Sequence, residues 1–359
     1  MTAHLTESNC YCRNPNCSEY KILNSPFVTY FGKTMTGVQR IFCRKCRKTA
    51  TVTKDTIFYR LRTPIPIVEE TLSLISDGAS LEGIQRAKGL NPETVRLWLK
   101  RAAEHVEEVQ KVLFNEFIPE VIQIDGMYSF VLHKGKFSEH PETNETGIFW
   151  VIVVLEKASR LRLFSIISKS EDEAAYEVML KLKTDFGLDK PPMIATDGKD
   201  AYAKAILDVW GIIPEYSGKG RPPQKKIPGD DWKCLQVVKT RERGEIVDVK
   251  INVVYGDADE TIKIIGPSTS YVERTHLTSR MMNRRLSRKT IGFSKQHQIH
   301  VSSIKWMDAV YNLVRPLRTL KERVSEYGRI WKQRTPAMAA NLTDHIWSIK
   351  NLLITNVVF

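Results

Sequence analysis

Three acidic residues stand where a carboxylate could perform chemistry. Asp125 interrupts an apolar run, Asp197 ends a short apolar run, and Glu273 precedes a row of arginines. An aspartate in an apolar strand is costly to bury unless it is paired or binds a cation. Carboxylates are ligands of hard divalent cations, and two such ions can activate the attacking oxygen and stabilise the leaving oxygen of a phosphodiester. The sequence therefore predicts Mg²⁺-dependent or Mn²⁺-dependent phosphoryl transfer, with Asp125 bridging two ions and the other acids holding one each.

Other acids compete for these roles. Asp200 could replace Asp197, although we expect it inside the following helix. A second acidic run at residues 257–260 has the composition of a loop and no adjoining basic helix; its acids are Asp257, Asp259 and Glu260. Asp125 could instead be a salt-bridge partner in the core, in which case no such metal site would exist.

Residues 269–290 are expected to form one basic helix. Positions three, four and seven apart share a helical face, and no acid follows Glu273 before Asp308. The polar face would carry Glu273, Leu277, Arg280, Arg284 and Arg288, and the opposite, packing face Val272, Thr275, Ser279, Met282 and Leu286. We expect Arg280, Arg284, Arg288 and Lys289 to bind DNA phosphates. The alternative is an ordinary first-turn acid followed by a basic surface.

Composition also favours a nucleic-acid partner. The chain has 359 residues, a formal net charge of +13 and a pI near 9.4. Residues 274–334 hold 15 Lys and Arg against 3 Asp and Glu, whereas residues 1–110 hold 16 against 11. No apolar run approaches the roughly 18 residues of a membrane span, and the N-terminus lacks a secretory pattern. We expect a soluble intracellular protein of two or three domains, with no membrane partner.

Five of the six cysteines fall in the first 46 residues. In an intracellular chain this clustering favours Zn²⁺ over disulfides. Cys43 and Cys46 have the two-residue spacing of a zinc knuckle, and two strands at 27–31 and 38–42 would form a hairpin before them. The predicted ligands are Cys12, Cys17, Cys43 and Cys46, with Cys10 as an alternative to Cys12. Residues 1–60 are therefore expected to form a zinc ribbon.

Residues 62–112 have the pattern of three helices. Ser80 is a candidate N-cap of the second helix, and Asn91 with Pro92 begins the third. Two helices joined by a short glycine-bearing turn are typical of a helix-turn-helix that reads the major groove. Its expected DNA-binding residues are Arg96, Lys100 and Arg101. The alternative is a helical spacer or dimerisation unit.

Residues 118–335 have the order of an α/β domain. Strands are expected at 119–132, 147–155 and 161–168, then a helix from 170, a strand ending at Asp197, another helix, and finally the basic helix. This is the ribonuclease H-like arrangement, in which acids on the first strand, the fourth strand and a late helix converge. A β-hairpin insertion is expected within 217–266, and 336–359 forms a C-terminal tail. The predicted fold class is α/β multidomain.

The stretch from Tyr271 to Lys295 resembles the signature around the last acid of DDE transposases of the insertion-sequence-1 family. The ending at 334–347 resembles the tail of members encoded as one reading frame, and the N-terminal half is similar to that family's DNA-binding half. The resemblance implies that Asp125, Asp197 and Glu273 form the catalytic triad and that Arg280 is the basic position after it. His276 departs from the polar residue in many members and receives no catalytic role.

The resemblance implies a prokaryotic, cytoplasmic, nucleoid-associated transposase. Such an enzyme binds the terminal inverted repeats of its element and transfers the cut strand to target DNA. Because one triad cannot easily bridge two ends, we expect a homodimer or larger assembly on DNA. The sequence contains no phosphate-binding loop of the kind that would indicate a nucleotide cofactor. The alternatives are a non-catalytic DNA-binding regulator and a structure-selective nuclease.

Overall fold

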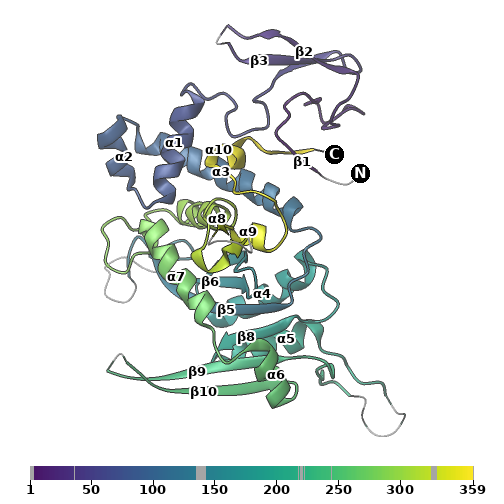
Figure 1. Cartoon of the computed structure of the whole chain (residues 1–359), viewed down its shortest axis with the longest axis vertical. Helices are drawn as coiled ribbons and strands as arrows, with labels where there is room; N and C mark the ends of the chain where they lie inside the picture. Colours follow the sequence, from purple (N-terminus) through teal and green to yellow (C-terminus); the bar gives the residue numbers. More distant parts are fainter. Residues whose placement is uncertain are drawn as a thin grey trace.

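The computed structural model describes residues 4–35, 37–134, 143–216, 218, 221, 223–243, 245–324 and 330–358. Its parts follow one another along the long axis (Figure 1). A three-stranded sheet lies at one end, a layer of helices in the middle and a six-stranded mixed sheet at the other end. No helix in the described ranges is long and apolar enough to cross a membrane.

The N-terminal sheet consists of β2 (Val28–Lys33), β3 (Gln39–Cys43) and β4 (Lys48–Thr51), paired antiparallel in that order. The predicted hairpin is confirmed, with Val28 opposite Cys43 and Tyr30 opposite Ile41. The hydrophobic cluster beneath it contains four buried residues, two of which are cysteines. A core this small requires another source of stability, such as a structural metal.

The middle layer is formed by α1 (Ile65–Ser76), α2 (Leu81–Lys88) and α3 (Pro92–Leu113). Both predicted caps are confirmed: Ser80 accepts a hydrogen bond from the Gly83 amide at 3.0 Å, and Asn91 accepts one from the Glu93 amide at 2.8 Å. The third helix continues to Leu113 because its apolar repeat persists. Val95, Trp98, Ala102, Val106 and Val109 form this buried stripe.

The C-terminal residues return to this layer. After α9 (Pro336–Ala339), α10 (Ile349–Ile354) packs against α1 and α3. The last strand, β13 (Asn356–Val358), pairs antiparallel with β1 (His4–Thr6), so the two ends of the described chain lie side by side (Figure 1). The segment predicted as a tail is therefore part of the helical layer.

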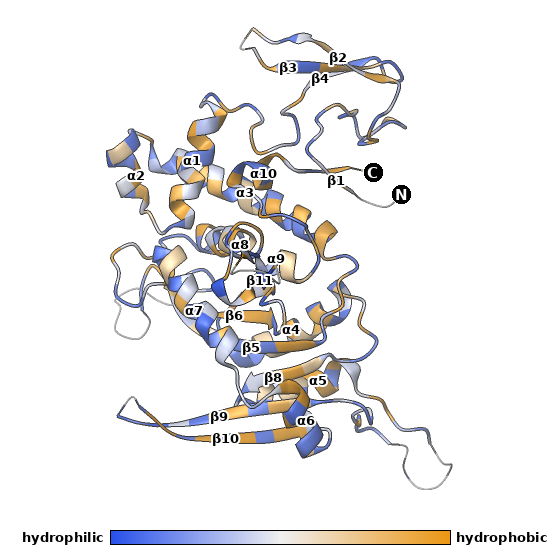
Figure 2. Cartoon of the chain, viewed as in Figure 1, coloured by the Kyte–Doolittle hydropathy of each residue, from blue (hydrophilic) through white to orange (hydrophobic). Residues whose placement is uncertain are grey.

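The large sheet has the strand order β10-β9-β8-β5-β6-β7. The strands β5 to β7 form the expected antiparallel meander, and β8 and β9 continue the sheet in parallel. Figure 2 shows β6 as hydrophobic along nearly all of its length, as suits a central strand. The bounds are β5 (Val121–Val131), β6 (Gly147–Glu156), β7 (Arg162–Ser168), β8 (Met193–Asp197), β9 (Cys234–Glu242) and β10 (Glu245–Tyr255).

The predicted order of elements is confirmed, with α4 (Glu171–Asp185) after β7 and α5 (Asp200–Trp210) after β8. The hairpin expected as an insertion contributes β9 and β10 to the main sheet. The prediction of a loop at 257–260 is wrong, because α6 (Ala258–Ile265) begins there. Asp257 caps this helix by accepting a hydrogen bond from the Glu260 amide at 3.0 Å.

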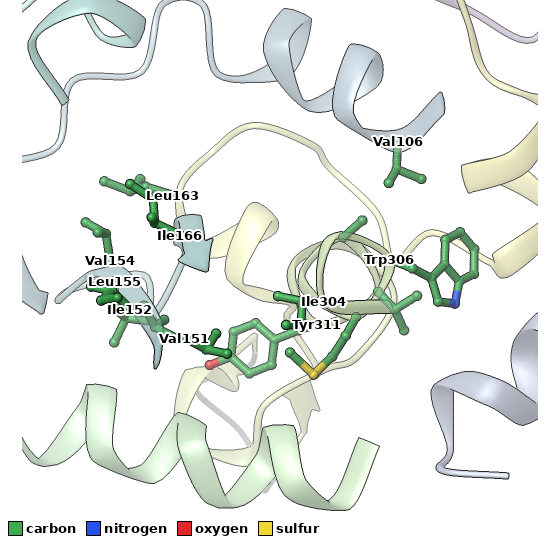
Figure 3. Close-up of a cluster of buried hydrophobic side chains, with 14 of the residues drawn as sticks. Val106, Val151, Ile152, Val154, Leu155, Leu163, Ile166, Ile304, Trp306 and Tyr311 are labelled. Atoms are coloured by element: carbon green, nitrogen blue, oxygen red, sulfur yellow. The ribbon is translucent and has the colours of Figure 1, made fainter. Parts of the chain in front are cut away.

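Two further helices cover the sheet: α7 (Ser270–Met282) lies across β5 and β6, and α8 (His297–Leu313) packs against β7 and α3. In Figure 3, Ile304 and Tyr311 of α8 face Val151 of the sheet, while Trp306 points to the other side. The Trp306 indole donates to Ser76 of α1 at 2.9 Å. The α8 helix thus joins the middle layer to the sheet. Short elements complete the chain: η1 (Arg284–Leu286), η2 (Arg318–Leu320), β11 (Glu322–Arg323) and β12 (Trp331–Lys332).

The prediction of one continuous basic helix over 269–290 is wrong. The α7 helix ends at Met282, and Asn283 takes an extended conformation with φ −128° and ψ 103°. The Asn283 amide group donates to Ser303 at 3.0 Å, and its oxygen accepts from the Arg285 amide at 3.2 Å. The bond to Arg285 is local and competes with helical hydrogen bonding, and the bond to Ser303 joins Asn283 to α8. Arg284 and Arg288 therefore do not continue the face that carries Glu273 and Arg280.

A fully buried arginine holds α7 and α8 against the edge of the sheet. Arg162 of β7 pairs with Asp308 of α8 at 2.8 Å. The same guanidinium donates to the Thr275 carbonyl at 2.9 Å and to the Ser279 hydroxyl at 2.8 Å, both on α7. Because removal of one partner would leave a buried charge unpaired, this arrangement is hard to alter.

Candidate active site and cysteine cluster

The four predicted cysteine ligands form a compact cluster. Their sulfur atoms all lie within 4.8 Å of one another, and the Cys12–Cys46 and Cys17–Cys43 sulfur distances are both 3.8 Å. A tetrahedral zinc site with Zn–S bonds of about 2.3 Å has sulfur–sulfur edges of about 3.8 Å. The sulfur of Cys10 instead lies 3.8 Å from the Val28 carbonyl oxygen, outside the cluster. The donor set and spacing fit a structural Zn²⁺ ion.

Strand register places the first two acids side by side. The parallel pairing of β5 with β8 sets Ile124 opposite Thr196, so the next residues, Asp125 and Asp197, are neighbours. Paired residues of adjacent parallel strands point to the same face. Asp125 thus lies on the same face as Gln123, two residues earlier, which contacts α7.

Gln123 fixes the third acid above this face. Its side-chain amide donates to the Ser268 carbonyl at 2.7 Å, just before α7. Its oxygen accepts from the Val272 amide at 3.1 Å, within the first turn of α7. Gln123 is buried, so both of its polar ends are satisfied by the segment that carries Glu273.

Asp125, Asp197 and Glu273 line one cavity of about 1210 Å³. Three segments that are far apart in sequence therefore contribute acids to one space. Basic residues outnumber the acids on its walls. They are Arg160, Lys239, Arg241, Arg274, Arg280, Arg288 and Arg318.

Each carboxylate has a partner. The Asp125 carboxylate lies 3.1 Å from Nε2 of His276. Glu273 forms an ion pair with Lys239 and accepts a hydrogen bond from the Thr269 hydroxyl at 2.6 Å. Over the described ranges, only the four cysteines form a group of three or more metal-ligand side chains with all ligand atoms within 4.8 Å. The three carboxylates share the cavity without forming such a close group.

The electrostatics of the cavity favour a cation between the aspartates. Burial, followed by the charge of Asp125, raises the pKa of Asp197 to about 6, although the Lys199 amide donates to its carboxylate at 3.3 Å. In the same cavity, burial and then the charge of Arg288 lower the pKa of Arg280. Desolvation and, second, like-charge repulsion thus disfavour the charged forms of both groups, and a divalent cation near Asp197 and a polyanion near Arg280 would offset these effects.

The predicted DNA-binding residues of the basic segment separate into two groups. Arg280 and Arg288 line the acid cavity. Arg284 lines a second cavity beside α2, and Lys289 is exposed to solvent.

The three predicted DNA-binding residues of α3 differ in the contacts that their side chains make within the protein. Arg96 pairs with Glu93, and Lys100 lies 4.0 Å from Glu104. Arg101 donates to the carbonyls of Ile57 and Tyr59 at 3.3 and 3.0 Å, so its guanidinium holds the segment before α1 against α3. Of the three side chains, that of Arg101 has the clearest structural role.

Sequence reasoning assigned no role to two residues that contact the acids. His276 follows Glu273 by three residues, and this helical spacing was a usable signal for a shared face. Lys239 follows Val237 by two residues on β9, so both point to the same side of the sheet. The position of Lys239 could not be predicted from this spacing, because β9 was expected to belong to an inserted hairpin and not to the main sheet.

Comparisons with known proteins do not assign a family. No protein-family model matches the chain, and no curated protein matches it. Three similar solved structures are complexes of Mos1 transposase. The paired-end complex with the left transposon end has a TM-score of 0.18 at 10% identity, covering 42% of this chain and 58% of that one. The chain thus spans less than two thirds of that protein.

The other two are the Mos1 strand transfer complex, at 10% identity, and a pre-cleavage Mos1 transpososome, at 9% identity. Each has a TM-score of 0.19 and covers 70% of this chain and 80% of that one. Scores this low carry no argument about fold or function. The function must therefore be argued from the residues and their geometry.

The cysteine cluster predicts one tightly bound zinc per chain. Changing Cys43→Ser should remove it, because the cluster would lose one of four thiolates. Metal content measured by mass spectrometry after dialysis should fall from one zinc per chain to almost none. The matched control Cys10→Ser should retain the zinc; loss of zinc from this variant, or its retention in Cys43→Ser, would contradict the assignment.

Because the pKa of Asp197 is raised, the free energy of unfolding should depend on pH in protein without Mg²⁺ or Mn²⁺. Its pKa is 3.8 ordinarily and about 6 in the folded chain. The folded state thus binds this proton more tightly than the unfolded state, and stability falls as pH rises from about 4 to 6. At pH 7, Asp197→Asn should be more stable than the parent by up to roughly 3 kcal/mol.

Thermal unfolding in EDTA from pH 5 to 8 measures this difference. The advantage of Asp197→Asn should grow as pH rises to about 7 and then level off. The neighbouring, exposed Asp200 provides the control, since Asp200→Asn should follow the parent protein. A constant difference between Asp197→Asn and the parent across this range would contradict the account.

Proposed function

We propose that this protein is a DNA transposase with a ribonuclease H-like catalytic domain. The observation that carries the proposal is the shared cavity, to which β5, β8 and α7 each contribute one acid. A space with paired aspartates, a nearby glutamate and many arginines suits a reaction on a phosphodiester. The resemblance of residues 271–295 to the insertion-sequence-1 family favours transposition among such reactions.

The donor chemistry of the three acids fits Mg²⁺ or Mn²⁺. Carboxylate oxygens are hard ligands. Burial, followed by the charge of Asp125, raises the pKa of Asp197, and a divalent cation at this position would offset both effects. Asp125, Asp197 and Glu273 would hold the ions. When bound, these ions supply Lewis-acid stabilisation of the attacking and leaving oxygens. Full participation of Glu273 requires Lys239 to move from its carboxylate.

The protein's own residues then have defined tasks. His276 orients the Asp125 carboxylate from α7, and Lys239 balances the charge of Glu273 until the cations bind. Arg280 and Arg288 hold DNA phosphates in the cavity. Water first cleaves a phosphodiester at the element end and leaves a 3′ hydroxyl. That hydroxyl attacks a phosphodiester of target DNA, forming one bond and releasing a new 3′ hydroxyl there.

The N-terminal parts provide DNA recognition in this proposal. Zn²⁺ held by the cysteine cluster stabilises the ribbon over residues 1–60, and α2 and α3 act as a helix-turn-helix on the inverted repeats. Two element ends require two acid cavities, so the active form is a homodimer or larger. We place this activity on DNA in the cytoplasm of a prokaryotic cell.

One observation favours a second candidate, a non-catalytic DNA-binding regulator. Asp125 and Glu273 both have basic partners, and a cavity that had lost its metal function would hold its acids in this way. A structure-selective nuclease would use the same cavity but would cut without joining. The reaction products distinguish these alternatives.

The acids should be essential for chemistry and dispensable for binding. Asp125→Asn, Asp197→Asn and Glu273→Gln should each reduce Mg²⁺-dependent nicking and strand transfer at least roughly a thousandfold. Labelled DNA carrying the element ends would be incubated with each variant and with plasmid target. Gel analysis separates nicked from joined products, and a mobility shift measures end binding.

Asp200→Asn is the matched control, because it removes an aspartate three residues from Asp197 and should retain activity. Strand transfer by any of the three acid variants would exclude that residue from the triad. Nicking without joining by the parent would identify a nuclease. End binding without either product would identify a regulator.

A further inference from the structure

A second basic cavity lies between the middle helical layer and the segment that follows α7. It has a volume of about 340 Å³. The helical layer contributes the start of α2 and Arg96 of α3. The other wall contains Arg284 and Arg285 of η1 and the loop 291–296 with Lys295. Parts of the chain far apart in sequence thus present cations to one small space.

Most of these cations lack an acidic partner. Arg96 pairs with Glu93, whose side chain is largely exposed. Arg284, Arg285 and Lys295 form no ion pair with any acid that the structure describes. Two acids, Glu82 and Glu93, also line the cavity, but both are exposed to solvent and the four cations outnumber them. The cavity therefore carries net positive charge.

Arg285 is desolvated and lies within electrostatic range of Arg96 and Glu82. Burial, followed by the charge of Arg96, lowers the pKa of Arg285 to about 10, so the guanidinium remains charged at neutral pH. The first turn of α2 also lines the cavity, and the amides of Leu81 and Glu82 have no intrahelical acceptor at this position. Cations and backbone donors together are what an anion such as phosphate requires.

The loop that carries Lys295 is held in place before any ligand binds. The Ser294 carbonyl accepts from the Leu132 amide at 2.7 Å, at the end of β5. The Ser294 hydroxyl lies 2.8 Å from Nδ1 of the buried His300. The adjoining Gly292 packs against the stem of Arg284. A preformed wall lowers the entropic cost of binding.

We propose that this cavity binds a backbone phosphate of duplex DNA, so that the helical layer and the acid-bearing domain hold one DNA segment together. The proposal rests on the DNA-binding function proposed above and assigns it a second contact. Arg284 and Arg285 line this cavity, while Arg280 and Arg288 line the acid cavity.

The test compares the full chain with the double variant Arg285→Gln/Lys295→Gln. Fluorescence anisotropy of a labelled duplex, in buffer without added Mg²⁺ or Mn²⁺ and without chelator, gives the affinity at several salt concentrations. The variant should bind about tenfold more weakly at low salt, and the slope of log K against log salt should become shallower by about 1. The control Lys190→Gln/Lys263→Gln removes the same charge from exposed positions of the sheet domain and should change neither value.

Equal thermal midpoints for both double variants and the parent exclude misfolding as the cause. If Arg285→Gln/Lys295→Gln binds DNA with the same affinity and the same salt dependence as the control variant, the proposal is overturned. Competition by inorganic phosphate in the parent, without weaker DNA binding in the variant, would identify a free-phosphate site and also overturn it. Because cleavage requires Mg²⁺ or Mn²⁺ and neither is added, an inactive triad would not affect this result. Failure of the parent and control to bind DNA would instead refute the proposed function.

Discussion

The seating of α7 across the sheet is the constraint on which the acid cavity depends. Gln123 binds the start of α7 through both ends of its side-chain amide, and Arg162 binds two further positions along the helix. All of these groups are buried or nearly so, and a shift of α7 would leave them unsatisfied at a cost of about 1–3 kcal/mol for each group. Glu273 is thereby held in the cavity that the two aspartates also line, although neither Gln123 nor Arg162 performs chemistry.

Charge is distributed so that DNA and divalent ions would complete the structure. Seven basic residues surround three acids in the larger cavity, and His276 and Lys239 partner two of those acids. The smaller cavity lies between α2 and the loop that contains Lys295, and its walls also carry more cations than acids. Binding of a polyanion near both would neutralise these charges, which links recognition by the helical layer to the chemistry proposed at the sheet.

Features encoded by neighbouring residues were predictable from sequence. The caps at Ser80 and Asn91, the cysteine spacing and the apolar strand patterns specified local elements, and these are present. Features that depend on distant partners were not predictable. The helix breaks at Asn283 because Ser303 accepts its amide hydrogen, and β9 extends the main sheet because β8 offers an open edge. The ion pair of Lys239 with Glu273 depends on this placement of β9.

The central claim is that residues 125, 197 and 273 hold the same metal ions. Iron-directed cleavage tests it directly: Fe²⁺ replaces Mg²⁺, and ascorbate with peroxide generates hydroxyl radicals that cut the backbone beside the ion. The account predicts cuts near all three residues, suppressed by excess Mg²⁺ and lost in Asp125→Asn. Cuts near only one of the segments, or cuts that persist in Asp125→Asn, would contradict it.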